Sequence, residues 1–313
     1  MSVPHIAPGS LEALESAERY FESEVRPKAQ EIDQSMFALT AAFEGLAAAK
    51  WLGLRVPQEY GGKGFADPAF RRFQEIAARC SGALAFLQTQ HQSAASFIVK
   101  SDNEDLKRRT LPKLATGELT AGIAFAQLRR HGAPMLTADR VPDGYVLQGN
   151  APWITGWGIF GHCVTAAKRE DGTTLFVWHR LAEEGGFTAT QPMHLAAMEV
   201  VQTVSGKFEK YFIPEADVLY IRPGNWIEEN DLINISLQAP FALGCAQAGV
   251  DILRSAFEKK KIPAIADAAD ALAEELARCR DEAYGAMENQ GDTQRSLEAR
   301  AWAIDLAGRS AHA

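Results

Sequence analysis

The chain has 313 residues, 47% hydrophobic and 23% charged, which is enough for one large or two to three smaller globular domains. With 32 basic and 40 acidic residues its net charge is −8 and its longest basic run is 259–261, which excludes the concentrated positive surface that nucleic-acid binding needs. Because there is no signal-peptide pattern and no apolar run near the roughly 18 residues of a membrane helix, we expect a cytoplasmic protein without membrane contact, with four reduced core cysteines, Cys80, Cys163, Cys245 and Cys279.

Residues 1–120 are predicted to form an all-helical domain. Apolar residues recur there every three or four positions, as on one face of an amphipathic helix. Ser10 is expected to cap the first helix, since its hydroxyl can accept from a free N–H. A loop rich in glycine and proline interrupts the pattern at 56–68. The predicted helices cover residues 10–25, 38–54, 68–101 and 103–118.

Residues 121–227 change to an apolar period of two, which predicts a central β-domain, either a small sandwich or a barrel. Asp-Gly, Gly-Gly and proline turns separate its short strands. A turn is expected at 149–152, just before the aromatic sequence Trp153-Ile154-Thr155. The predicted strands cover residues 143–151, 162–169, 173–181 and 203–212.

From residue 228 to 313 the helical period returns, predicting a C-terminal bundle with helices over 265–289 and 295–313. Helices, then strands, then helices is an α+β order, not a βαβ one. No strand is followed by GxGxxG and a helix, and no GxxxxGK[ST] occurs, so a Rossmann site and a P-loop are disfavoured. Metal-ligand spacing of histidines is also absent, so no metal site is expected.

Four ordered segments resemble the acyl-CoA dehydrogenase family. "LAAAKWLGLRVPQEYGGKGF" is similar to that family's Pro-x-x-Tyr-Gly-Gly-x-Gly stretch, and "DGYVLQGNAPWIT" to its Asp-Gly, Leu-x-Gly and Trp-Ile-Thr sequence. "SDNEDLKRRTLPKLATGELTAGIAFA" and "FEKYFIPEADVL" resemble the runs before its first strand and at its last strand. The resemblance implies an acyl-CoA dehydrogenase-like fold with a helical N-terminal domain, a central β-domain and a shortened C-terminal helical bundle.

The resemblance also implies an FAD between the β-domain and the bundle, a homodimer or homotetramer, and a small-molecule substrate, possibly an acyl thioester. Trp153, Ile154 and Thr155 match the segment that backs the isoalloxazine ring, where an aromatic edge and a hydroxyl orient the cofactor. A structural alternative is that Trp153 is an ordinary core tryptophan.

A second cofactor segment is expected at "FAQLRRHG", with Phe125, Gln127, Leu128 and Gly132 as the cofactor-binding residues. The family carries Thr-Glu-Pro-x-x-Gly-Ser-Asp there, so two arginines stand near the Glu-Pro pair and reverse the local charge. Backbone N–H groups can bond a flavin edge without any particular side chain. The arginines are interpreted either as an exposed basic turn or as a site adapted to an anionic ligand or reduced flavin.

The carboxylate that takes the α-proton in this family is not evident in the sequence. The chain ends at Ala313, before the place of a C-terminal base, and Asn234 falls near the alternative position in the first bundle helix. Asp231 and Glu229, about one turn earlier, are weak candidates for a relocated base. His91 is a weak candidate for a histidine near the flavin, although a mid-helix histidine is more often packed and hydrogen-bonded.

Three functions therefore remain open from sequence. The first is a flavin-dependent oxidoreductase of acyl-CoA dehydrogenase-like type with an unknown substrate. The second is a flavin-dependent monooxygenase of the same fold, which needs no α-carbon base. The third is a non-catalytic family member that has lost flavin and acts as a binding or assembly protein.

Overall fold

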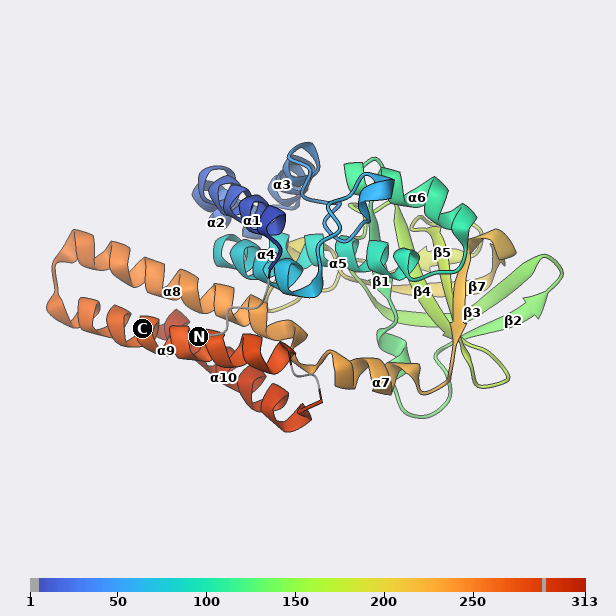
Figure 1. The fold of residues 1–313 in the computed structure, drawn as a ribbon. Coiled ribbons are helices and arrows are strands. Elements are labelled where there is room, and N and C mark those ends of the chain that lie inside the picture. Colours follow the sequence, from blue (N-terminus) through green and yellow to red (C-terminus); the bar gives the residue numbers. More distant parts are fainter. Residues whose placement is uncertain (1–5, 289–290) are drawn as a thin grey trace. The chain divides into compact units, whose positions relative to one another are not determined.

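The computed structural model describes residues 6–288 and 291–313, which form two compact units (Figure 1). The bundle unit comprises residues up to 31, 65–85 and 231–313, and the sheet unit comprises 32–64 and 86–230. Each unit is made of several separate segments of the chain, whereas the predicted domains, with boundaries at 120 and 227, are consecutive. Those boundaries stay a prediction. Within the described residues, no helix has the length and apolar character needed to cross a membrane.

The bundle unit is built from helices that pack on one another through small and apolar side chains. α1 (Pro8–Tyr20) packs on α4 (Asp67–Cys80), α4 on α8 (Ala239–Lys260), and α8 on α9 (Pro263–Glu288) and α10 (Thr293–His312). Its core is rich in alanine and leucine, because close helix packing leaves little room between the axes. Shorter helical segments in or bordering this unit are Phe21–Val25 (π-helical), Arg26–Lys28 (3-10), α2 (Ala29–Gln34), α7 (Trp226–Ile233) and Ile235–Gln238 (3-10).

Two helix starts differ from the sequence prediction. α1 begins at Pro8 after Ala7 and has no side-chain cap, so the predicted cap at Ser10 is wrong: a proline fits the first turn, where its missing N–H costs nothing. The single helix predicted over 68–101 is two helices, α4 and α5 (Gly82–Val99). Ser81 between them is extended, and its hydroxyl accepts from the Leu84 N–H at 3.2 Å, which caps α5.

Gly244 brings α4 and α8 into contact. A Cβ at this position would lie 2.4 Å from the Glu75 carbonyl oxygen, which is backbone and cannot yield without moving a helix. Gly308 of α10 is also helical, but a Cβ there would meet nothing within 4 Å. Replacing each of these two helical glycines with alanine should therefore change the free energy of unfolding in opposite directions.

We expect Gly244→Ala to lower the free energy of unfolding by about 1–3 kcal/mol through overpacking. Gly308→Ala should instead raise it by about 0.5–1 kcal/mol, because alanine favours the helix. Urea unfolding followed by circular dichroism measures both. A stabilised Gly244→Ala protein would contradict the close α4–α8 approach.

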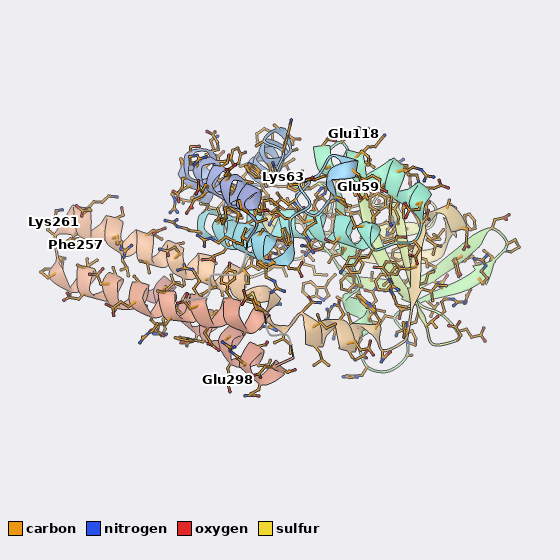
Figure 2. All side chains as sticks on the ribbon, viewed as in Figure 1. Glu59, Lys63, Glu118, Phe257, Lys261 and Glu298 are labelled. Carbon is orange, nitrogen blue, oxygen red and sulfur yellow. The ribbon has the colours of Figure 1, made fainter. Side chains whose placement is uncertain are left out.

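α8 ends at its junction with α9 through Lys261, whose φ of 54° places it in the left-handed region. The Lys261 Nζ lies 5.5 Å from the centroid of the Phe257 ring, so the residue that ends the helix also packs on its last turn (Figure 2).

The sheet unit contains one mixed sheet in which the described residues form eight strands. Their hydrogen-bonded order is β6-β7-β3-β2-β4-β5-β8, and β1 pairs with β4 in parallel. The helices α5 and α6 (Glu104–Thr116) share one apolar core with β4 and β5. The strands are β1 (Ala121–Ala124), β2 (Leu136–Val141), β3 (Gly144–Ile154), β4 (His162–Lys168), β5 (Thr174–Arg180), β6 (Phe187–Ala189), β7 (Val204–Pro214) and β8 (Val218–Arg222); the other helical segments in this unit are α3 (Met36–Ala48), Gln58–Tyr60, Ala126–Arg129, Glu199–Val201 and Glu215–Asp217.

β3 is one continuous strand, so the turn predicted at 149–152 is wrong. Gly149 has a φ of +126°, and a Cβ there would lie 2.1 Å from the Met135 carbonyl oxygen. The pairing with β7 shifts register between Leu147 and Gly149, so the glycine forms a bulge that bends the strand without ending it.

The cysteine environments agree with the prediction in part. Cys80, Cys163 and Cys279 are buried, as expected for core cysteines. Cys245, on α8, is exposed, so the expectation that it lies in the core is wrong.

Candidate functional site

The two segments expected to contact a cofactor meet inside the sheet unit. Residues 126–129 form a short 3-10 helix, η4, which packs against β3 and β4. β1 pairs in parallel with β4, and η4 begins two residues after β1 ends, so this pairing places η4 next to the sheet. The sheet therefore brings "FAQLRRHG" beside the strand that carries Trp153.

A β-bulge determines how Trp153 is presented. The pairing of β3 with β7 shifts register between Ala151 and Ile154, and Pro152, which has no N–H to donate, lies within that bulge. Trp153 is consequently 44% exposed, whereas Ile154 is fully buried in the core. The alternative that Trp153 is a core tryptophan is excluded by this exposure.

Thr155 follows the bulge and carries a buried hydroxyl. Its Oγ1 lies 3.3 Å from the Oγ1 of Thr203, which is also buried, and either hydroxyl can be the donor. The next residues are held in place because the Gly156 N–H donates to the Val201 carbonyl oxygen at 2.8 Å. The chain just after Trp153 thus carries a buried pair of hydroxyl groups, one from Thr155 and one from the segment before β7.

Gln127 and Leu128 face the core and not solvent. The Gln127 amide donates to the carbonyl oxygens of Ala124 (3.1 Å) and Ala166 (2.7 Å), which anchors η4 to β1 and β4. Its own Oε1 is buried without a partner among the described residues. Their side chains therefore hold the segment in place, and any cofactor contact from 127–128 has to come from the backbone.

The exposed part of the segment is basic. Arg129, Arg130, His131 and Gly132 all face solvent, and the Arg129 guanidinium lies 5.7 Å from the centroid of the Phe125 ring. Gly132 has a φ of +99° with no atom within 4 Å of an added Cβ, so another group can approach this backbone closely.

His91 lies away from any exposed surface, in the core of the sheet unit. Its Nε2 donates to the Leu114 carbonyl oxygen at 3.0 Å and its Nδ1 accepts from the Ala121 N–H at 3.3 Å, while the ring packs edge-on against Phe43. Burial, only partly offset by the hydrogen bond to Leu114, lowers the pKa of His91 to about 4. Both ring nitrogens are occupied, so His91 links α5 to α6 and β1 and is not placed to serve a flavin.

The two candidate carboxylates lie on α7. Glu229 is exposed and accepts from the Asn225 amide at 2.7 Å, and Asp231 is half-buried one turn from the C-terminal end of the helix. Asn234, which falls near the base position of the family, follows α7 directly. Neither carboxylate is fully buried.

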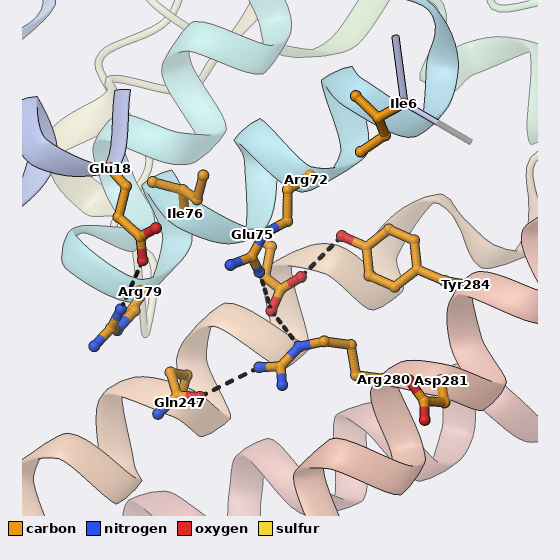
Figure 3. Close-up of a pocket in the computed structure, with 10 residues that line it drawn as sticks. All are labelled: Ile6, Glu18, Arg72, Glu75, Ile76, Arg79, Gln247, Arg280, Asp281 and Tyr284. Atoms are coloured by element: carbon orange, nitrogen blue, oxygen red, sulfur yellow. Dashed lines mark hydrogen bonds and ion pairs between the residues drawn. The ribbon is translucent and has the colours of Figure 1, made fainter. Parts of the chain in front are cut away.

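A buried ionic cluster in the bundle unit escaped the sequence prediction (Figure 3). Glu75, only 2% exposed, accepts from Arg72 and Arg280 through Oε1, both at 2.8 Å, and from the Tyr284 hydroxyl through Oε2 at 2.8 Å. The sole sequence signal was a glutamate on the apolar stripe of α4, with Arg72 three residues before it.

Opposing effects act on Glu75. Burial alone would raise the pKa of this carboxyl, but Arg72 and Arg280 outweigh it and hold the pKa below its usual value of 4.5. Burial and the neighbouring carboxylate together raise the pKa of Tyr284 well above its usual value. The cluster is therefore a charged carboxylate between two guanidinium groups and a neutral phenol.

Comparison with known proteins shows similarity to acyl-CoA dehydrogenases. Residues 10–118 match the family model "Acyl-CoA dehydrogenase, N-terminal domain". The chain is 28% identical over 219 residues to the mitochondrial isovaleryl-CoA dehydrogenase of Solanum tuberosum, covering 66% of this chain and 52% of that protein. It is 25% identical over 246 residues to the 3-(aryl)acrylate reductase of Clostridium sporogenes, covering 75% and 65% of the two chains. Residues 10–118 therefore match an acyl-CoA dehydrogenase N-terminal domain, and the chain is similar to acyl-CoA dehydrogenases over about two thirds of its length.

Solved structures show the acyl-CoA dehydrogenase fold over nearly the whole chain. The acyl-CoA dehydrogenase of Geobacillus kaustophilus superposes with a TM-score of 0.82 at 17% identity, covering 99% of this chain and 88% of that one. A chain from work on the electron transferring flavoprotein of Acidaminococcus fermentans reaches a TM-score of 0.84 at 19% identity, with coverage of 100% and 87%. The chain spans about half the length of the isovaleryl-CoA dehydrogenases that it matches.

The solved structures and the matched N-terminal domain confirm the predicted fold: helices, a mixed sheet and C-terminal helices in this order. The test of whether a flavin fits rests on the sheet unit itself. An exposed indole, two adjoining hydroxyl groups and an open glycine backbone are compatible with a planar, partly polar ring system. The residues present therefore have chemistry that fits a flavin.

Proposed function

We propose that this chain is an FAD-dependent oxidoreductase of acyl-CoA dehydrogenase type. The observation that supports the proposal most directly is the bulge in β3, a strand that contacts η4, which leaves Trp153 facing solvent. Because Ile154 beside it is buried, the bulge leaves the Trp153 indole free to contact a ligand while the strand stays in the core.

Each segment has a distinct part in this proposal. Trp153 packs against the edge of the ring system, and the hydroxyl groups of Thr155 and Thr203 donate or accept at its polar atoms. Backbone N–H groups around Gly132 approach the ring's other edge. A bound flavin would supply the acceptor for a hydride. The positive charges of Arg129 and Arg130 would favour an anionic ligand or flavin form at this place.

The substrate class is an acyl thioester in this proposal, in keeping with the acyl-CoA names of the relatives. Asp231 and Glu229 remain the proposed sources of a base, because both lie on α7 shortly before Asn234. We further propose a cytoplasmic homodimer or homotetramer. Leu297 and Ile304, exposed seven residues apart on α10, support association because they form one apolar stripe.

The test is the visible absorption spectrum of the purified full-length chain and its titration with FAD. We expect Trp153→Ala to weaken FAD binding about 10- to 100-fold, since an aromatic contact and its buried area contribute about 1.5–3 kcal/mol together. Phe212→Ala is the matched control, because Phe212 is 47% exposed on β7 of the same sheet.

FAD affinity should be unchanged in Phe212→Ala, and both variants should unfold at the wild-type urea concentration because both rings are exposed. A colourless protein that takes up no added FAD would overturn the proposal and favour a non-catalytic binding subunit. Equal loss of FAD in both variants would remove Trp153 from the site.

A further inference from the structure

A cavity of about 260 Å³ lies beside the Glu75 cluster, entirely within the bundle unit (Figure 3). It has room for roughly eight water molecules at liquid density, so it can accept a small organic molecule. Residues of α4, α8 and α9 line it, together with Ile6 and Glu18. Nothing in the proposed flavin chemistry uses this cavity.

At the end of the cavity formed by Arg72, Glu75, Arg280 and Tyr284, here called the inner end, the charges do not cancel. Arg72 and Arg280 share the single carboxylate of Glu75, while the Tyr284 hydroxyl is neutral. This inner group therefore carries one surplus positive charge. The third lining guanidinium, Arg79, is already matched by Asp251 at 2.7 Å and by Glu18 at 3.1 Å.

Guanidinium donors remain available at the same end. Within the described part of the chain, Arg72 contacts Glu75 through Nη1 alone, which leaves its Nε and Nη2 without protein acceptors. Arg280 uses Nε for Glu75 and Nη2 for the Gln247 amide oxygen at 3.2 Å, which leaves Nη1. Glu75 already accepts from three groups, so it acts to hold both guanidinium groups in place.

The remaining walls decide the size and charge of an occupant. Ile76 and Ile6 supply an apolar side, and Asp281 lies on the far side of the Arg280 stem with its carboxylate turned away from the guanidinium (Figure 3). A single negative charge balances the inner group. A dianion would leave an excess negative charge near Glu18, which costs free energy in a partly buried site.

We propose that this cavity binds a small monocarboxylate with a short apolar chain. Its carboxylate is received by the free N–H groups of Arg72 and Arg280, in the geometry that guanidinium groups offer to carboxylates. Its apolar chain packs against Ile76 and Ile6. The proposal does not depend on FAD binding, so either can fail without the other.

Sodium butyrate is the probe, titrated into the full-length chain by isothermal calorimetry at constant ionic strength. Sodium phosphate and neutral butyramide are measured beside it. We expect saturable butyrate binding to the wild type and at least about tenfold weaker binding to Arg72→Gln, because a charge-assisted contact is lost. Butyramide and phosphate should bind far more weakly than butyrate.

Arg108→Gln is the matched control, since Arg108 pairs with Asp105 three residues away on the exposed face of α6, as Arg72 pairs with Glu75 on α4. It should bind butyrate like the wild type. No saturable butyrate binding to the wild type, undiminished binding to Arg72→Gln, or phosphate binding as tight as butyrate would each overturn the proposal.

Arg72→Gln should fold, because Glu75 keeps Arg280 and Tyr284 as partners. If Arg72→Gln does not fold, a measurement on the wild type tests the same site. Phenylglyoxal modifies accessible arginines, and butyrate should slow modification of Arg72 and Arg280 but not of Arg108, as read by peptide mass mapping. Equal rates with and without butyrate would overturn the site.

Discussion

Replacing Glu75 with leucine is expected to lower the free energy of unfolding by about 3–5 kcal/mol. Leucine has a similar size, but it leaves Arg72, Arg280 and the Tyr284 hydroxyl without the carboxylate that joins α4 to α9. Removing one member of a buried ion pair is costly because its partners stay partly desolvated and uncompensated. Urea unfolding at pH 7, followed by circular dichroism, measures the change.

The matched control is Glu282→Leu. Glu282 also receives two hydrogen bonds from one guanidinium, that of Arg295, at 2.6 and 3.0 Å, but both side chains are exposed. We expect a loss below about 1 kcal/mol there. Similar losses in the two variants would show that burial at Glu75 contributes nothing.

The contribution of Glu75 should also depend on pH. Since its folded pKa is lowered, its stabilising effect is fully present above the unfolded value of about 4.5 and is lost as the pH falls through the folded pKa. The wild type should therefore lose stability below about pH 4.5 more steeply than Glu75→Leu. Parallel acid profiles for the two proteins would contradict a charged, buried Glu75.

Replacing His91 with leucine is expected to lower the free energy of unfolding by about 2–4 kcal/mol at pH 7. The Ala121 N–H and the Leu114 carbonyl lose their partner inside the core of the sheet unit, and each such group costs about 1–3 kcal/mol. Thermal unfolding with calorimetry measures the loss. His194→Leu is the control, because that imidazole is exposed and pairs only with Glu199.

The effect of His91→Leu should shrink as the pH falls. The unfolded imidazole takes up its proton near pH 6.5, whereas burial lowers the pKa of the folded His91 to about 4, so protonation favours the unfolded wild type between these values. This shift removes about 3 kcal/mol of wild-type stability over that range. His179, whose pKa burial also lowers to about 4, adds a second loss that both proteins share. A difference independent of pH would show that His91 is not buried neutral.

Local signals in the sequence were sufficient for most of the elements. The helix predicted over 103–118 is α6: the Asn103 side chain caps its start by accepting from the Leu106 N–H at 3.0 Å, and Gly117, with a φ of 80°, ends it. The alternating strands and the long C-terminal helices lie where their periods place them. The resemblance of four ordered segments to the acyl-CoA dehydrogenase family also predicted the fold.

The positions of the functional side chains were predicted less well. Three local signals misled: Ser10 as a cap, one helix over 68–101, and a turn at 149–152. Pro8 starts α1 two residues before Ser10, and Ser81 ends α4 and caps α5. Gln127 was assigned by resemblance to a cofactor segment; its side-chain amide anchors two strands, and a cofactor contact from its backbone stays a prediction.

The sequence by itself determined the order and type of the longer elements, because caps, turns and periodicity act between residues a few positions apart. Only the tertiary structure decided that Trp153 is exposed, that His91 is enclosed, and that Glu75 meets Arg280 across 205 residues of chain. Those outcomes depend on how closely distant segments approach, as Gly244 allows between α4 and α8, and on which buried polar groups find partners there. No local pattern carries that information, since the energy of each such contact depends on both segments at once.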